Sequence, residues 1–206
     1  MCGSSSTSGT SNAFARFLKL CAARTGHLLN LSDLARDVGA SVPTIKRWIS
    51  ALEASHQIYL LPPYHRNFGK RVIKAPKLYF LDTALTTYLL GLYSEESILG
   101  GPYLGPLVET VVVAEWLKAC HHHGEPPSLY YWRSRDGLEV DLLVERSGRL
   151  HPMEVKATST LTPAHATSLQ KWRSLTGETT PGLIFANIHR PVPVAEGVRG
   201  VPWSAV

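Results

Sequence analysis

Apolar residues recur at helical spacing through the first part of the chain. Residues 13–26 carry them three and four positions apart and end at a glycine, which favours a helix with a C-terminal cap. A second helix is predicted over residues 32–39, with Ser32 as N-cap, and a third from Ser41, with its inward face formed by Ile45, Ile49 and Leu52.

Two strands are predicted after these helices, in "QIYLLPPY" and "RVIKAPKLYFLD", with a basic tip at residues 65–71 between them. Three helices followed by a hairpin predict an N-terminal winged helix-turn-helix. In that motif the third helix enters the DNA major groove and the hairpin touches phosphates. The residues that we expect to face nucleic acid are Thr44, Lys46, Arg47 and Ser50 on the helix and Lys70, Arg71, Lys74 and Lys77 on the wing. The alternative is a packing or protein-binding unit whose charges form a solvated face.

The second half predicts a different arrangement. A short helix capped by Asp82 precedes a stretch rich in glycine and proline, residues 100–106, which predicts a boundary. Beyond it the pattern predicts, in order, a helix, three strands, a helix and a strand, over residues 107–120, 129–133, 139–144, 150–156, 163–175 and 182–186. This is an α/β (α+β) core in which helices flank a mixed sheet. The expected domains are residues 13–99 and 100–206, after a disordered lead-in over residues 1–12; no element is predicted beyond Arg190.

Three charges stand where the second and third strands would carry buried side chains. Alternation places Asp141 on one face of its strand, opposite Val140 and Leu142, and places Glu154 and Lys156 together on the next strand. In a hairpin, Asp141 and Glu154 approach each other. Two carboxylates that close repel unless a cation lies between them or one is protonated, and a hard divalent ion such as Mg²⁺ or Mn²⁺ meets that need.

A fourth charge comes from the helix over residues 107–120. Glu109 shares a helical face with Val112, Val113 and Trp116, the face expected to pack on the sheet. Burying a carboxylate is costly unless it is paired or bound to metal. We therefore expect Glu109 to join Asp141 and Glu154 as a metal ligand.

Carboxylates, a divalent ion and a lysine suit phosphodiester hydrolysis. The metal acidifies a water and stabilises charge on the phosphate, and a lysine beside it can position the water. The expected catalytic residues are Glu109, Asp141, Glu154 and Lys156. The alternative is a shell without catalysis, used for nucleic-acid or protein binding, in which Lys156 only forms ion pairs with carboxylates.

These residues carry a resemblance. Asp141 followed by "EVK" at residues 154–156, after a helix bearing Glu109, resembles the PD-(D/E)XK, restriction-endonuclease-like superfamily, although Val140 stands where many members have proline. Nearly the whole chain, including "LDTAL" and "GPLVETVVVAEWLK", resembles the C-terminal region of a family of prokaryotic AAA-type ATPases, in which a winged helix precedes a nuclease-like module. That family usually has glycine at the position of Ala84. The resemblance implies an AAA-type ATPase module as partner, in the same chain or another.

Composition and the absence of certain motifs limit which activities, locations and partners we expect for this chain. The chain has no GxxxxGK[ST] phosphate loop and no apolar run that could cross a membrane. Its three cysteines show no paired spacing, which favours reduced thiols and a cytoplasmic protein. The net charge of +5 permits a polyanionic partner, DNA above all, without requiring one.

Overall fold

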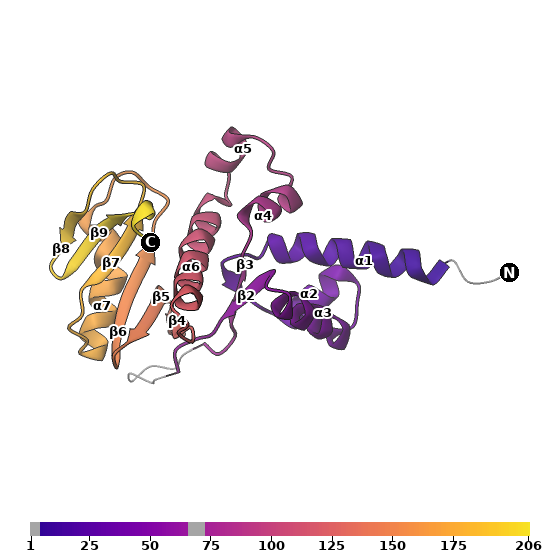
Figure 1. Ribbon diagram of the computed structural model, residues 1–206, viewed down its shortest axis with the longest axis horizontal. Coiled ribbons are helices and arrows are strands. Elements are labelled where there is room, and N and C mark those ends of the chain that lie inside the picture. Colours follow the sequence, from indigo (N-terminus) through magenta and orange to yellow (C-terminus); the bar gives the residue numbers. More distant parts are fainter. Residues whose placement is uncertain (1–4, 66–72) are drawn as a thin grey trace.

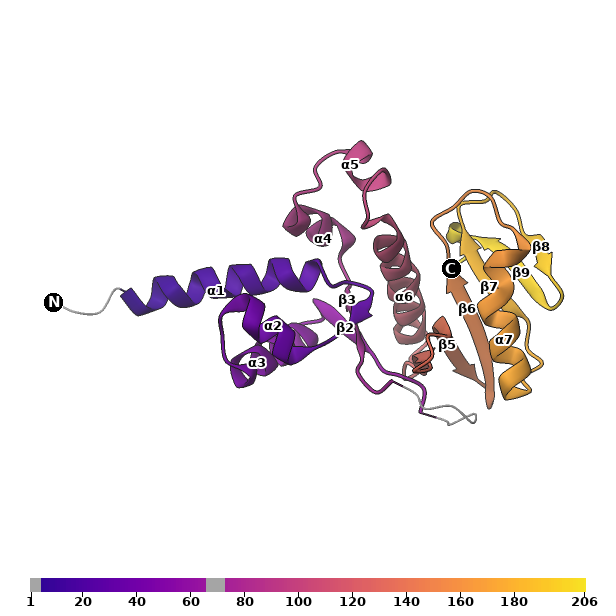
Figure 2. The same cartoon turned by 180° about the vertical axis from the view of Figure 1, so that it is seen from behind.

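The computed structural model describes residues 5–65 and 73–206 and contains two sheets (Figure 1). We call residues 5–65 and 73–99 the N-terminal unit and residues 104–206 the sheet module. The long helix α6 lies between the small sheet of the N-terminal unit and the larger sheet, as both views show (Figures 1 and 2). The predicted mixed α and β architecture is confirmed at this level.

Three helices and a three-stranded antiparallel sheet begin the N-terminal unit. In chain order they are α1 (Ser5–Ala22), β1 (His27–Leu28), α2 (Leu31–Val38), α3 (Val42–Ala54), β2 (Ile58–Leu61) and β3 (Lys77–Phe80). The strand order is β1-β3-β2, so β3 lies in the centre. The strand β1 was not predicted; with two residues, it is too short to show an alternating pattern.

The caps explain where the helices start and stop. Asn30, rather than the predicted Ser32, caps α2, because its side chain accepts hydrogen bonds from the backbone N–H groups of Ser32 and Asp33. Gly39 ends α2 with φ of 76°, a left-handed conformation that glycine adopts without strain. Ser41 caps α3 as predicted.

Helix α1 starts earlier than predicted. We expected residues 1–12 to be disordered, but the helix runs from Ser5. Once a helix is nucleated, each added residue contributes a hydrogen bond, so the packed segment can extend into a stretch of weak helix formers. The predicted inward residues of α3, Ile45, Ile49 and Leu52, are buried with Phe17 in one hydrophobic core, which confirms the helical face.

Two further helices close the N-terminal unit. Asp82 caps α4 (Thr83–Leu90) as predicted, by accepting the N–H groups of Ala84 and Leu85. The five-residue helix α5 (Glu95–Leu99) was missed because its sequence is too short for a periodic pattern.

The sheet module has six strands and two main helices. Its elements are α6 (Leu104–His122), β4 (Leu129–Arg133), β5 (Glu139–Arg146), β6 (Arg149–Val155), the 3₁₀ turn η1 (Pro163–Ala166), α7 (Thr167–Thr176), β7 (Gly182–Ala186), β8 (Val192–Ala195), β9 (Val198–Pro202) and the 3₁₀ turn η2 (Trp203–Ala205). The strand order is β4-β5-β6-β7-β9-β8. The pairs β6/β7 and β7/β9 are parallel and the others antiparallel, so the sheet is mixed as predicted.

The two faces of this sheet are covered by different helices. Met153 and Val155 pack with Val112 and Val113 of α6, whereas Ile184 packs with residues of α7. A fully buried Trp172 lies on the α7 side. The predicted inward face of α6 and the face assigned to Met153 and Val155 are confirmed.

The strands β8 and β9 were not predicted. Prolines at positions 193 and 202 and glycine at 200 weaken the strand signal in this segment. Pro193 and Pro202 nevertheless lie in strands, because Pro193 is on the edge strand β8 and Pro202 is the last residue of β9.

The N-terminal unit and the sheet module share a hydrophobic core. Leu61 of β2 and Tyr79 of β3 are fully buried in the same cluster as Val112 of α6. The buried hydroxyls of Thr25 and Thr110 are 2.9 Å apart, which adds a polar link between the two parts. The position of β3 is therefore coupled to that of α6.

Candidate functional site

Asp141 lies just beyond the last pair of partner residues between β5 and β6. The β5/β6 ladder ends at the pair Leu142 and Met153, and beyond it the Asp141 carboxylate accepts the N–H of Val155 at 2.9 Å. A side chain thus takes the place of the next main-chain contact. Asp141 is held to β6 beside Glu154 and Lys156.

A β-bulge accounts for this position. The β4/β5 register shifts between Tyr130 and Trp132, so one additional residue of β5 is accommodated near Asp141. As a result, Val140 joins the core on the α7 side while Leu142 joins the core on the α6 side. The expectation that Val140 and Leu142 share a face is wrong, because strict alternation fails at a bulge.

Lys156 bridges the two carboxylates of the motif. Its Nζ pairs with Glu154 Oε2 and lies 3.7 Å from Asp141 Oδ2. Glu154 is almost completely buried, at 3% exposure. The three residues singled out in the sequence therefore do come together.

The pKa values of Glu154 and Lys156 are both shifted by burial and by the nearby carboxylate of Asp141. Burial, and then the neighbouring Asp141, raise the pKa of Glu154 well above its usual range, although Lys156 opposes the shift. Burial would lower the pKa of Lys156, but Asp141 and Glu154 raise it above its ordinary value, so Lys156 is an ammonium ion.

Glu109 is engaged by the N-terminal unit. Its Oε1 accepts a hydrogen bond from Lys77 Nζ at 2.9 Å and another from the Tyr79 hydroxyl at 2.5 Å. Both donors belong to β3. The expected position of Glu109 on the buried face of its helix is correct, but its partners come from the small sheet.

Lys77 was assigned to a solvent-facing wing, and that assignment is wrong. The residue is 4% exposed and its Nζ also lies 2.6 Å from Glu139 Oε1. The ammonium lies over the Tyr131 ring, 5.6 Å from its centroid. Lys77 is therefore buried among acidic and aromatic side chains of the sheet module.

The alternation of β3 explains how Lys77 and Tyr79 reach α6. Leu78 and Phe80 are buried in the helical core of the N-terminal unit, so Lys77 and Tyr79, which alternate with them along β3, face the opposite way. The sequence analysis missed Lys77, Tyr79 and Glu139 as members of the site. The alternating pattern in "KLYF" was a usable signal, but nothing in the sequence placed that strand beside α6.

The charges of this second group are also mutually dependent. Burial, followed by the charge of Asp141, raises the pKa of Glu109 to about 7, although Lys77 and Tyr79 counteract the shift. Burial alone would lower the pKa of Lys77, but Glu109, Asp141 and Glu139 raise it above its ordinary value. Asp141 thus raises the pKa of both Glu109 and Glu154, and we call these three carboxylates the acidic cluster.

The carboxylates of the acidic cluster are the type of ligand that a hard metal ion such as Mg²⁺ prefers. They do not form a complete set of metal ligands in the part of the chain that the structure describes. Carboxylate oxygens suit Mg²⁺ and Mn²⁺, and the raised pKa values of Glu109 and Glu154 reflect carboxylates that a cation would relieve. Within residues 5–65 and 73–206, however, no three acidic, histidine or cysteine side chains converge closely enough to hold a metal ion. Glu109, Asp141 and Glu154 remain proposed ligands.

The residues expected to contact nucleic acid have mixed outcomes. Lys46 and Arg47 are exposed on α3. Thr44 is half-buried, and its hydroxyl lies 2.9 Å from that of Ser41 at the helix start. Lys70 and Arg71 lie outside the described residues.

Comparisons with known proteins place the chain in a family. Residues 104–206 match a family described as domain of unknown function (DUF4143), and residues 6–96 match another described as domain of unknown function (DUF8612). The DUF4143 match spans half of the chain, so the chain belongs to that family.

Two curated relatives match most of the chain. They are the uncharacterized proteins Mb2031c of Mycobacterium bovis and Rv2008c of Mycobacterium tuberculosis, each 33% identical over 181 residues. The match covers 88% of this chain and 40% of each relative, so the chain corresponds to less than half the length of either. No solved structure matches significantly. In the part of the chain that the structure describes, none of the helices has the length and apolar character needed to cross a membrane.

Proposed function

We propose that the chain is the C-terminal, nucleic-acid-handling region of a protein of the AAA-type ATPase class, and that the cluster around Asp141 is a divalent-metal site for phosphodiester hydrolysis. The single observation that carries the proposal is that the side chains of Asp141, Glu154 and Lys156 meet where the pairing of β5 with β6 ends. Both carboxylates contact the same ammonium there.

The surrounding topology supports this reading. A helix precedes three antiparallel strands, and β6 then pairs in parallel with β7 after α7. This is the element order expected from the resemblance to the PD-(D/E)XK superfamily. The motif residues lie on β5 and at the end of β6, where that resemblance puts its active site.

Each residue has a definable task in such a reaction. Asp141 and Glu154 would hold Mg²⁺ or Mn²⁺, which supplies Lewis-acid stabilisation of the phosphate and a more acidic water. Lys156 would orient the attacking water and stabilise developing negative charge. Because the Lys156 side chain is 32% exposed, an approaching phosphate can reach it.

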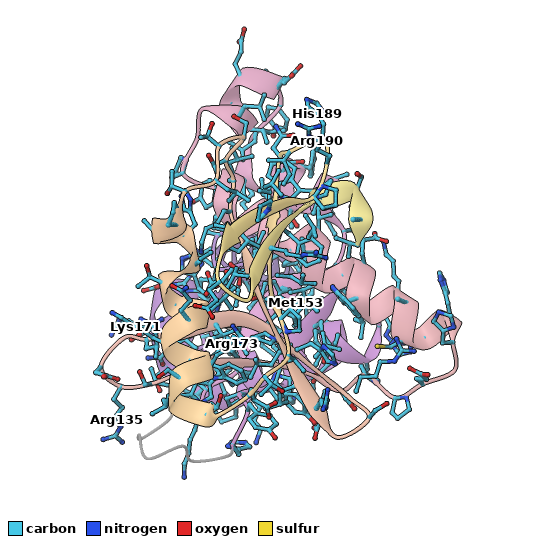
Figure 3. The ribbon with its side chains drawn as sticks, turned by 90° about the vertical axis from the view of Figure 1, so that its left-hand side faces the viewer. Arg135, Met153, Lys171, Arg173, His189 and Arg190 are labelled. Atoms are coloured by element: carbon cyan, nitrogen blue, oxygen red, sulfur yellow. The ribbon has the colours of Figure 1, made fainter. Side chains whose placement is uncertain are left out.

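Basic residues at the edge of the sheet where β6 ends, the edge that carries Lys156, favour a polyanionic substrate. Since β6 and β7 run parallel, the segments after Val155 and Ala186 emerge at the same edge. The exposed His189 and Arg190 follow β7 and project from one end of the module, whereas Arg135 lies at the opposite end (Figure 3). The guanidinium of Arg190, on the segment that follows β7 at this edge, would contact backbone phosphate.

The test is cleavage of single-stranded, duplex and branched DNA and of RNA by the full chain, with Mn²⁺, with Mg²⁺ and with a chelator. Asp141→Ala and Lys156→Ala should each lower the rate at least about 100-fold. Glu115→Ala, on the exposed side of α6, is the matched control and should retain the parent rate. Cleavage that survives Asp141→Ala or the chelator would refute the proposal.

A second candidate function is nucleic-acid or protein binding without cleavage. The observation that favours it is the ion-pairing of the acidic cluster by Lys77 and Lys156 within the chain itself. In that reading the AAA-type ATPase module uses this region as a docking or regulatory unit. Metal-independent DNA binding with no cleavage of any substrate in the same assay would favour it.

A further inference from the structure

Helix α6 is apolar on two sides, and the large sheet covers one of them. Val112 and Val113 pack in the core formed with the sheet. A second stripe, with the helical spacing of three and four residues, runs along the other side through Leu104, Val108 and Val111. Val111 is 39% exposed. A helix that is apolar all round is normally buried all round, but within the described residues this second stripe is only partly covered.

A groove of about 320 Å³ follows the second stripe of α6. Its other walls come from the N-terminal unit, where α4 contributes Ala84 and Thr87 and α5 contributes Ile98. Both views show α5 at the end of a projection beyond α4 and α6 (Figures 1 and 2). We call this feature the α4–α6 groove.

Large exposed apolar side chains border the α4–α6 groove. Tyr88, one turn after Ala84 on α4, is 65% exposed, and Leu99 of α5 is 55% exposed. The ring of Tyr93, 77% exposed, lies 6.2 Å from that of Tyr88. Together with Val111, these are four of the six large apolar side chains that are exposed among the described residues. Exposed apolar residues that gather in one place mark an interaction site, whereas isolated ones do not.

The segment that forms the groove is acidic, although the chain as a whole is basic. Residues 78–117 contain five acidic residues and no lysine, arginine or histidine, whereas the net charge of the chain is +5. Asp82 and Glu95 are exposed at the starts of α4 and α5, the helices that form two of the walls. The first cation along α6, Lys118, is already paired with Glu115. A partner with positive charge beside an apolar surface would complement this groove.

We propose that the α4–α6 groove is a docking site for an amphipathic helix of a protein partner, with apolar residues on one face and lysine or arginine residues flanking that face. The walls of the groove are helices whose side chains project at intervals of three and four residues, and such ridges pack best against another helix. The stripe on α6 faces away from the large sheet. The inference is therefore independent of the hydrolytic function proposed for Asp141, Glu154 and Lys156.

The test uses the full chain and a synthetic helical peptide of about 18 residues, long enough to form a helix, with leucines on one face and lysines on both flanks. Fluorescence anisotropy of the labelled peptide measures its Kd. A matched peptide has the same leucines and carries glutamates in place of the lysines. The lysine peptide should bind with a Kd at least about tenfold lower than that of the glutamate peptide.

Substitutions in the groove locate the bound peptide. Tyr88→Ser/Val111→Ser should raise the Kd of the lysine peptide at least about tenfold, because two apolar contacts are lost. Val42→Ser, at an apolar residue that is 40% exposed on α3, is the matched control and should leave the Kd unchanged. Because all three side chains are exposed, the variants should fold like the parent, which circular dichroism checks.

Charge reversal tests the chemistry of the partner. Glu95→Lys/Glu96→Lys should raise the Kd of the lysine peptide about threefold or more at low salt, and by a smaller factor at high salt. Glu125→Lys/Glu196→Lys makes the same change in net charge at two exposed positions of the sheet module. This control should leave the Kd within about twofold of the parent value.

The outcomes decide for or against the proposed occupant. Higher Kd values in the groove variants, with the controls unchanged, would support docking of a basic amphipathic helix. An unchanged Kd in Tyr88→Ser/Val111→Ser, equal affinity for the two peptides, or no binding of the lysine peptide would overturn it. A dimer of the parent chain in sedimentation velocity that is lost in Tyr88→Ser/Val111→Ser would also overturn it, because a second copy would then occupy the groove.

Discussion

Lys77 and Glu109 are 32 residues apart in the sequence, and their side chains form a hydrogen-bonded ion pair of 2.9 Å. The pair joins the central strand of the N-terminal sheet to the helix that covers the larger sheet. It also connects two charges that the sequence suggested for separate tasks, phosphate contact for Lys77 and metal binding for Glu109. Because Lys77 is buried against Glu109, it is not available for the phosphate contact that the sequence suggested.

Loss of Lys77 alone should destabilise the fold. Lys77→Met leaves Glu109 and Glu139 without their buried cation, and we expect the free energy of unfolding to fall by about 3–5 kcal/mol. In Lys77→Met/Glu109→Gln the loss should be smaller than the sum of the two single changes, because the partners are removed together. Urea unfolding of the four proteins measures this coupling; additive effects would contradict it. The exposed Lys118→Met should change the free energy by less than about 0.5 kcal/mol.

Asp141 should have separable structural and chemical roles. Asp141→Asn keeps a carbonyl oxygen that can accept the Val155 N–H, so the thermal unfolding midpoint should stay within a few degrees of the parent. The amide is a poorer ligand for Mn²⁺ than the carboxylate, so Mn²⁺ binding should weaken at least about tenfold. Asp141→Ala should lose both properties. Equal Mn²⁺ affinity in Asp141→Asn would argue against a metal role for Asp141.

Gly200 lies in a closely packed part of β9. A Cβ there would overlap Leu161 Cδ1 and lie 3.2 Å from Val192 Cγ2, so Gly200→Ala should destabilise the protein by about 1–3 kcal/mol. The control is Gly105→Ala on α6, where an added Cβ meets nothing within 4 Å. Alanine favours helices, so the control should be neutral or more stable by about 0.5–1 kcal/mol. Differential scanning calorimetry of both variants compares them directly.

The two described cysteines should differ in reactivity. Burial raises the pKa of the Cys21 thiol to about 12, whereas Cys120 is only half-buried. With Cys2 replaced by serine, a disulfide reagent at pH 8 should modify Cys120 and reach Cys21 only after unfolding. Because the folded state raises the Cys21 pKa from its ordinary value of 9.0, stability contributed by the neutral thiol is complete below pH 9 and declines above it. Rapid modification of Cys21 in the folded protein would contradict its burial.

Arg47 tests DNA contact by the third helix. Arg47→Glu should weaken duplex DNA binding about tenfold and reduce the salt dependence of the affinity by about one unit of slope, because Arg47 is exposed on α3. Arg149→Glu changes net charge equally and lies on an exposed end of β6, so it is the matched control. Fluorescence anisotropy across a salt series measures both. Equal losses in the two variants would indicate a nonspecific effect of net charge.

Local signals predicted much of this fold. Capping residues such as Ser41 and Asp82, and apolar periodicity in α3 and α6, depend on neighbours in sequence, so they could be read directly. The convergence of Asp141, Glu154 and Lys156 followed from hairpin geometry and a resemblance. The bulge near Asp141 could not be read, because a register shift depends on how β5 pairs with β4.

The role of Lys77 was missed for a related reason. Its strand has clear alternation, but the element that covers each face is decided by tertiary packing of residues far apart in sequence. The same holds for Glu139, which meets Lys77 only because the N-terminal unit packs on the sheet module. Contacts between distant elements decided the composition of this site, and local pattern could not supply them.

The two-sided strand β3 makes this region sensitive to length. Deleting one residue within β3 would exchange its faces, sending Lys77 toward the apolar helical core and a leucine toward Glu109. A single substitution, by contrast, disturbs only one face. Insertions and deletions in β3 should therefore be tolerated far less well in natural variants than substitutions, and only length changes of two residues would preserve the partners of each side chain.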